Sequence, residues 1–66
     1  MNYTYTDLGN GLYEVKVNTI LFILDIQDPT QASMINDFNT DPSKLEYFAT
    51  LLYENPNTAY SIYNNM

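Results

Sequence analysis

The sequence predicts an α+β fold in which a small antiparallel sheet of two or three N-terminal strands packs against two C-terminal helices. Residues 3–26 are rich in β-branched and aromatic side chains punctuated by Gly and Asn, and two Asp-Pro dipeptides mark helix starts in the second half. Strands followed by helices in this segregated order argue against a parallel α/β sheet. The 66 residues leave room for one small acidic domain.

The first predicted unit is a hairpin over residues 3–17. Residues 3–6 alternate aromatic and polar side chains, and residues 7–11 contain Asp, Asn and two Gly, which tolerate the positive φ of a tight reversal. Residues 12–17 alternate again with period two. We expect one face of this second strand to be buried, namely Tyr13, Val15 and Val17.

A third strand is predicted at about residues 19–26, after a break or turn at Asn18-Thr19. Five consecutive apolar residues, 20–24, are too many for a strand with one solvated face and are typical of a central strand. A buried helix is the alternative that periodicity alone does not separate. Length and β-branching favour the strand.

Two helices are predicted at about residues 29–38 and 42–54. Asp28 and Asp41 accept hydrogen bonds from free helix N–H groups, and the Pro that follows each forfeits none. Gln31, three residues after Asp28, completes a pair that resembles a capping box. The Asn55-Pro56-Asn57 segment ends the second helix.

Helical phase assigns sides to both predicted helices. In the first, Ile35 and Phe38 form the buried stripe, flanked by Ala32 and Met34. In the second, the inward residues are Leu45, Phe48, Ala49 and Leu52, and the outward ones are Ser43, Glu46, Tyr47, Thr50 and Glu54. The tail, residues 58–66, is consistent with a short helix or with an edge strand.

The residue inventory argues against catalysis, cofactors and metal sites. The chain has no His and no Cys, which removes triad chemistry, thiolate nucleophiles, zinc ligands and disulfides. Asp25 and Asp28 are expected to be a strand-end charge and a helix cap. Residues 37–43 resemble the start of a calcium loop, but Pro42 and Phe48 stand where that loop needs Gly and a bidentate Glu. We expect a protein that is not an enzyme.

Charge narrows the class of partner. Eight acidic residues against two lysines give a net charge of −6, which repels phosphate backbones and anionic lipid surfaces. No apolar stretch approaches the length of about 20 residues needed to span a bilayer, and the first residues lack the pattern of a secretion signal. We therefore expect a cytoplasmic protein with no direct nucleic-acid or membrane partner.

Partner-binding residues are predicted from exposure and charge. Tyr47 is the leading single candidate, because helical spacing places it on the outward side of the second helix and Tyr is favoured in interfaces. Acidic residues on or beside the helices would form a negative face that steers and orients a basic partner. The complete predicted set is Tyr47, Glu54, Glu46, Asp37, Asp41 and Asp28.

Two function classes follow. The first is a small acidic inhibitor or regulator that docks on a basic surface of a host protein. This class predicts binding that weakens as salt concentration rises. In composition the chain resembles phage or mobile-element inhibitors that mimic DNA, which implies a nucleic-acid-handling partner in the host cytoplasm. The alternative is a small structural or accessory subunit that acts through homo-oligomerisation or assembly, and a homodimer is one possible form.

Overall fold

In the computed structural model, which describes residues 1–65, the N-terminal half forms one three-stranded antiparallel sheet. The strands are β1 (Tyr3–Gly9), β2 (Leu12–Val17) and β3 (Ile20–Asp25), in the order β1-β2-β3. This confirms the predicted α+β fold with three strands, and the helical alternative for residues 20–24 is wrong. The β-branched and aromatic residues favour extended backbone here, and each strand joins the next through a short turn.

The turns depend on residues that tolerate left-handed backbone. Gly9, Asn10 and Gly11 have φ of 86°, 56° and 80°, and Asn18 has φ of 55°. Such angles cost little at Gly and are tolerated by Asn. The pairing of β1 with β2 is also irregular between Asp7 and Gly9, where a β-bulge shifts the register.

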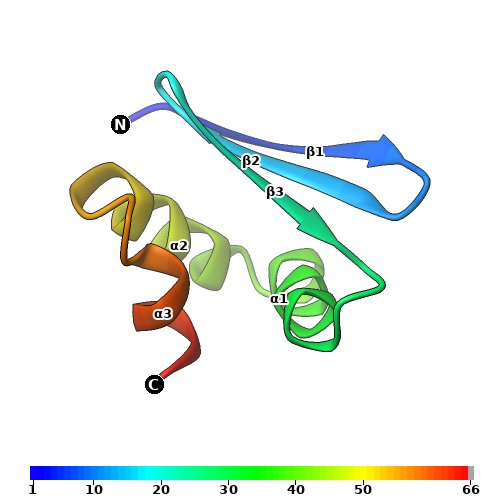
Figure 1. The fold of residues 1–66 in the computed structure, drawn as a ribbon. Helices are drawn as coiled ribbons and strands as arrows, with labels where there is room; N and C mark the ends of the chain where they lie inside the picture. Colours follow the sequence, from blue (N-terminus) through cyan, green and yellow to red (C-terminus); the bar gives the residue numbers. More distant parts are fainter. Residues whose placement is uncertain (66) are drawn as a thin grey trace.

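One strand prediction needs correction. The apolar run 20–24 was expected to be a central strand, but β3 lies at the edge of the sheet. Its outer-face side chains, Leu21 and Ile23, are 56% and 46% exposed. On one face of β3, Ile20, Phe22 and Leu24 pack against the core under the helices. On the other face, nothing within the described residues covers Leu21 and Ile23 (Figure 1).

Three helices complete the chain: α1 (Pro29–Thr40), α2 (Pro42–Glu54) and α3 (Ala59–Asn64). The side chains of Asp28 and Asp41 accept hydrogen bonds from the first free N–H groups of α1 and α2, as predicted. Helix α1 extends two residues past the predicted end at Phe38, and the Thr40 hydroxyl donates to the Asn36 carbonyl over its last turn. In the tail, for which the sequence is consistent with a short helix or an edge strand, the structure has the short helix α3.

Gln31 behaves differently from the predicted capping box. The Asp28 side chain accepts from the Gln31 N–H at 3.1 Å, which is the expected half of the motif. The Gln31 Oε1 atom, however, accepts from the Asp25 N–H at 2.7 Å instead of returning to Asp28. The Asp28 N–H is already bonded to the Asp25 carbonyl at 3.1 Å, so Gln31 ties the end of β3 to the start of α1.

The helices form a second layer against one face of the sheet, as Figure 1 shows, and the core lies between the layers. Phe48 is fully buried near its centre, with ring centroids 5.3–5.5 Å from those of Phe22, Phe38 and Tyr63. The predicted inward residues of α2 are buried except Leu45, which is half-buried, and Leu51 is a buried residue that the prediction missed. The buried set comprises Val15, Val17, Leu24, Met34, Ile35, Phe38, Phe48, Ala49, Leu51, Leu52, Ala59 and Tyr63.

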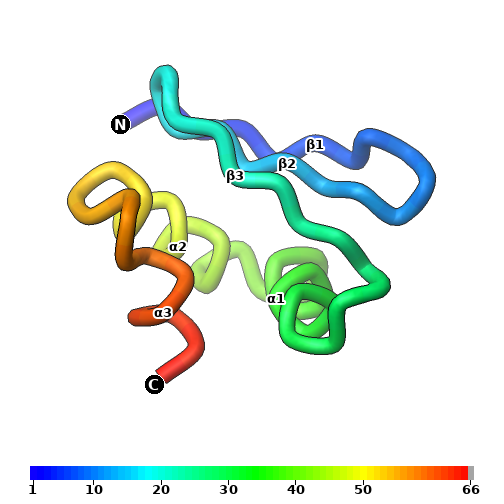
Figure 2. Tube along the Cα trace, viewed as in Figure 1, coloured from blue at the N-terminus to red at the C-terminus, as the bar shows by residue number. Residues whose placement is uncertain are grey.

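The chain trace in Figure 2 places the N-terminus beside the β2–β3 turn, at the end of the sheet away from the β1–β2 turn. A backbone hydrogen bond of 3.4 Å from the Asn18 N–H to the Asn2 carbonyl joins these segments. Among residues 1–65, no helix has both the length and the apolar composition to cross a membrane.

Candidate functional site

The outward side of α2 carries two glutamates and two tyrosines. At 100° per residue, positions 46, 47, 53 and 54 fall within one sector of about 120°. All four side chains are exposed, with Tyr53 at 54% and Tyr47 at 37%. At about 1.5 Å per residue, the sector extends about 12 Å along the helix. We name this surface the acidic tyrosine face: Glu46, Tyr47, Tyr53 and Glu54.

The two tyrosines of this face differ in how firmly they are held. The Tyr47 ring centroid lies 6.1 Å from that of Tyr63, a buried residue of α3, so Tyr47 packs on the core along one side. Tyr53 has no such ring partner among residues 1–65. Tyr47 is therefore held against the core on one side and exposed on the other, and Tyr53 is the more exposed of the two.

Three of the five acidic residues in the predicted binding set are engaged within the fold. Asp28 and Asp41 cap α1 and α2, so their carboxylates face backbone N–H groups. Asp37 accepts a 2.8 Å hydrogen bond from the Tyr63 hydroxyl and lies 3.6 Å from the Lys44 ammonium. The fold thus brings together Glu46, Tyr47 and Glu54 and leaves the three aspartates outside this face.

Sequence reasoning missed Tyr53. A signal was available, because Tyr53 lies seven residues after Glu46 and positions two turns apart share a stripe of a helix. Glu54 follows Tyr47 by the same interval. The acidic tyrosine face therefore consists of two parallel stripes, each with one carboxylate and one phenol.

Local contacts shift the pKa values of Tyr63, in α3, and of Asp41, the N-cap of α2. Burial is the largest cause that raises the pKa of the Tyr63 hydroxyl above its usual value, and its hydrogen bond to Asp37 adds to this. The hydrogen bond from the Ser43 hydroxyl holds the pKa of Asp41 below its usual value, reinforced by the Ser43 N–H. Tyr63 thus stays neutral and Asp41 charged at neutral pH, as their structural roles require.

The carboxylates of Asp25 and Asp28 accept hydrogen bonds from backbone N–H groups. Asp25 accepts from the Gln27 N–H at 2.9 Å, and Asp28 accepts from Thr30 and Gln31. Within residues 1–65 no three acidic side chains are grouped closely enough to hold a metal ion. These contacts agree with a charge at the end of β3 for Asp25 and a helix cap for Asp28.

The second surface of interest is the outer face of the sheet, which the helices leave uncovered (Figure 1). Cross-strand register places Lys16 opposite Leu21 and Glu14 opposite Ile23 on this face. Leu8, beside the β1–β2 turn, is 47% exposed. The face is therefore apolar along β3 and charged along β2.

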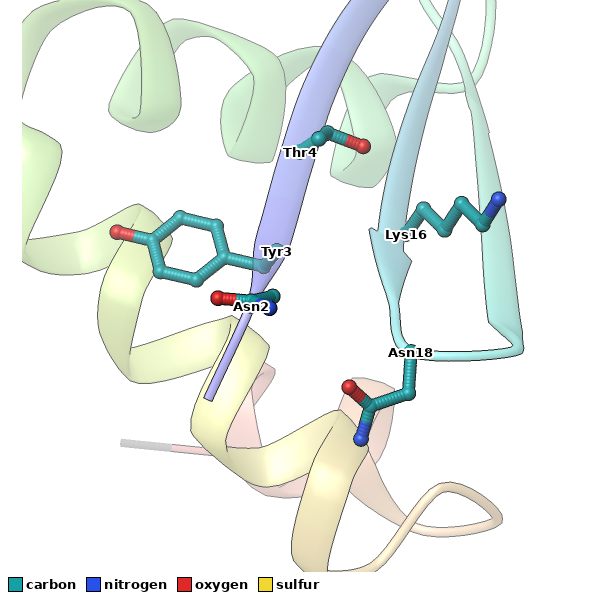
Figure 3. A pocket seen from close by; sticks show the side chains of 5 residues that line it. All are labelled: Asn2, Tyr3, Thr4, Lys16 and Asn18. Atoms are coloured by element: carbon teal, nitrogen blue, oxygen red, sulfur yellow. The ribbon is translucent and has the colours of Figure 1, made fainter.

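A shallow hollow of about 300 Å³ lies at the end of β1 and β2, next to the β2–β3 turn. Figure 3 shows the Lys16 side chain directed away from the Tyr3 ring, with the Thr4 hydroxyl on the Lys16 side of β1. A small-molecule site requires polar groups that converge on the ligand, and the polar groups around this hollow do not converge. The lining residues are Asn2, Tyr3, Thr4, Lys16 and Asn18.

The chain matches no protein-family model, no curated protein and no solved structure. Function is therefore inferred from two surfaces of the chain itself, the acidic tyrosine face of α2 and the outer face of the sheet.

Proposed function

We propose that the chain is a non-catalytic protein-binding module, an inhibitor or regulator that docks the acidic tyrosine face on a basic surface of a host protein. The observation that carries this proposal is the arrangement on α2, where Glu46, Tyr47, Tyr53 and Glu54 are exposed on one side of a helix. The absence of His and Cys from the sequence supports a role without catalysis.

The chemistry of this face suits a protein partner. Tyrosine supplies a large, stiff contact area together with a hydroxyl, at the cost of fixing only two side-chain angles. Carboxylates at the rim attract arginine and lysine, which speeds association and orients the complex. Within residues 1–65, Glu46 and Glu54 form no salt bridge, so both remain free to pair with a partner.

A nucleic-acid-handling protein of the host cytoplasm is the partner that fits best. Its basic groove is adapted to phosphates, and the carboxylates of a chain with net charge −6 would stand in for them. Such a role matches the phage or mobile-element inhibitors that the chain resembles in composition. Duplex DNA should then compete with the chain for the same surface.

The test captures partners on tagged protein from a lysate of the cells in which the chain naturally occurs, with elution in rising salt and mass spectrometry of each fraction. A basic protein that leaves at moderate salt is expected, because surface ion pairs are screened. Its affinity for purified chain is then measured by calorimetry at several salt concentrations, with and without duplex DNA.

Matched variants locate the contact. Glu54→Gln removes one charge from the acidic tyrosine face, and Glu14→Gln removes one charge from the sheet without touching α2. We expect Tyr47→Ala to weaken binding about tenfold or more, as central interface residues do. Glu54→Gln, at the rim, should slow association and reduce the salt dependence of binding, and Glu14→Gln should change neither. Equal affinities of all three variants, with the fold intact, would exclude this face.

The second candidate is a structural or accessory role through homo-oligomerisation. The observation that favours it is the uncovered apolar strip along β3, where Leu21 and Ile23 are each about half exposed. Association through such a strip would be insensitive to moderate salt, since apolar burial is not screened.

A further inference from the structure

The free edge of β3 offers unpaired backbone groups. The Asp25 N–H points away from β2, because it donates to Gln31 Oε1 at 2.7 Å. Backbone direction alternates along a strand, so the N–H and carbonyl groups of Leu21 and Ile23 also point to this edge. Outside the sheet ladder, no backbone hydrogen bond within residues 1–65 reaches either residue.

Protection of this edge is incomplete. Natural edge strands are usually blunted by Lys, Pro, a bulge or a covering element. The β1 edge has a bulge near Asp7, whereas the pairing of β2 with β3 is regular over all six residues. Helix α1 reaches only the Asp25 end, through Gln31. The stretch 20–24 is uncharged, so none of its side chains carries the charge that usually discourages pairing at an edge.

We propose that a second copy of this chain supplies the missing neighbour. The two β3 strands pair antiparallel about a twofold axis at Phe22, so that Leu21 of each copy lies opposite Ile23 of the other. The result is a continuous six-stranded sheet in which β3 becomes a central strand. This inference rests on the second candidate function and adds the surface, the register and the symmetry.

The register follows from which edge groups are free. Opposing residues must point to the same face and must both direct their backbone groups outward, which restricts the pairing to odd-numbered residues. An axis at Phe22 uses the free groups of Leu21 and Ile23 in both copies. An axis at Ile23 would instead require the Asp25 N–H, which is already bonded to Gln31.

Charge on the outer face agrees with the same arrangement. Because Lys16 is opposite Leu21 and Glu14 is opposite Ile23, each row of the six-stranded sheet runs from Lys16 of one copy through two apolar residues to Glu14 of the other. Each row therefore carries one positive and one negative charge, and continues to Thr4 and Thr6 of the two β1 strands. Stacking two sheets face to face would bury Lys16 and Glu14 instead, at a large desolvation cost.

Most of the carboxylates lie away from the middle of β3. Five of the eight carboxylates lie in residues 28–54, among the helices and their caps, and none lies in residues 20–24. A standard interface buries about 800 Å² on each partner, and about 500 Å² is the lower limit for a specific one; the whole surface of the chain is 4160 Å². A strand edge only about 20 Å long is a small contact, so a reversible, concentration-dependent dimer is expected.

Sedimentation analysis over a range of concentrations tests the dimer, and amide hydrogen exchange tests its location. We expect the Leu21 and Ile23 amides to gain protection as the dimer forms. The outward amides of the other edge, at Tyr3 and Tyr5, serve as the internal reference and should stay unprotected. Moderate salt should leave the dissociation constant unchanged.

Two matched lysine variants test the edge. Ile23→Lys and Thr6→Lys add the same charge to the same face, and both new side chains lie directly opposite Glu14, one from β3 and one from β1. We expect Ile23→Lys to raise the dissociation constant at least tenfold and Thr6→Lys to change it less than twofold. Circular dichroism confirms that each variant is folded.

The outcomes separate the inference from the function on which it rests. Equal effects of the two lysines, or protection at Tyr3 and Tyr5, would show self-association through another surface, which overturns the inference and leaves the second candidate function standing. A monomer at the highest attainable concentration would overturn both.

Discussion

The Tyr63 hydroxyl donates a 2.8 Å hydrogen bond to Oδ2 of Asp37, which ties α3 to α1 across 26 residues of sequence. The Tyr63 ring also packs edge-on against Phe38 and Phe48, at centroid distances of 5.6 and 5.5 Å. One buried tyrosine thus fixes the last helix to the core through both its ring and its hydroxyl.

Tyr63→Phe is expected to lower the free energy of unfolding by about 1 kcal/mol, because the ring contacts stay while the Asp37 carboxylate loses a donor. Urea unfolding followed by circular dichroism measures the change. Tyr53→Phe is the control, since that side chain is exposed and should change stability by less than about 0.5 kcal/mol. Equal losses in both variants would contradict the role of the hydrogen bond.

Alkaline pH is expected to destabilise the fold. Burial, with the neighbouring Tyr13 and Asp7, raises the pKa of Tyr5 to about 12, and the pKa of Tyr63 is raised as well. In the unfolded chain tyrosine ionises near pH 10. Above that pH the unfolded state binds fewer protons than the folded state, so stability falls as pH rises. Below that pH both tyrosines are protonated in both states, so they do not make the free energy of unfolding depend on pH.

Urea midpoints between about pH 9 and about pH 11 measure this slope. The Tyr5→Phe and Tyr63→Phe double variant should show a flatter decline, because phenylalanine does not titrate. An unchanged slope would mean that both hydroxyls ionise as readily in the folded chain as in the unfolded one.

Asp41→Ala is expected to lower the free energy of unfolding through loss of the α2 cap. Asp41→Asn should retain most of that stability at neutral pH, because Asn caps helices about as well as Asp. The pKa of Asp41 is lowered by Ser43, so its charge-dependent stability is present above the unfolded pKa and is lost as pH falls through the folded one. Thermal unfolding at neutral and acid pH should show that Asp41→Asn lacks this acid-dependent component.

The two turn glycines should respond differently to alanine. Gly9 and Gly11 both have positive φ, so either substitution strains the backbone by about 1 kcal/mol. A Cβ at Gly9 meets nothing within 4 Å, whereas one at Gly11 would lie 2.5 Å from the Ile26 Cγ2 atom. Gly11→Ala should therefore be the more destabilising in chemical denaturation. The reverse order would contradict the close packing of Ile26 on this turn.

Local rules predicted the elements well, because their signals lie within a few residues of one another. The Asp-Pro dipeptides located both long helices, since a cap and the N–H groups it accepts are at most three residues apart. Period-two alternation located β2 and its buried face. The undecided tail had no such signal, and α3 is fixed by the packing of Tyr63 on residues more than a dozen positions away.

The candidate site was predicted less completely for the same reason. Helical phase placed Glu46, Tyr47 and Glu54 on one side of α2, but it did not show that Asp37 is engaged by a residue of α3. Nor did it show that the apolar run of β3 lies at a sheet edge.

The sequence by itself determined the α+β class, the caps of the two long helices and the outward side of α2, which are all set by short-range backbone preferences. The tertiary structure alone decided strand order, the partners of Asp37 and the exposure of Leu21 and Ile23. These properties depend on which distant segments pack together, and packing is set by the combined burial of the whole chain rather than by any local pattern.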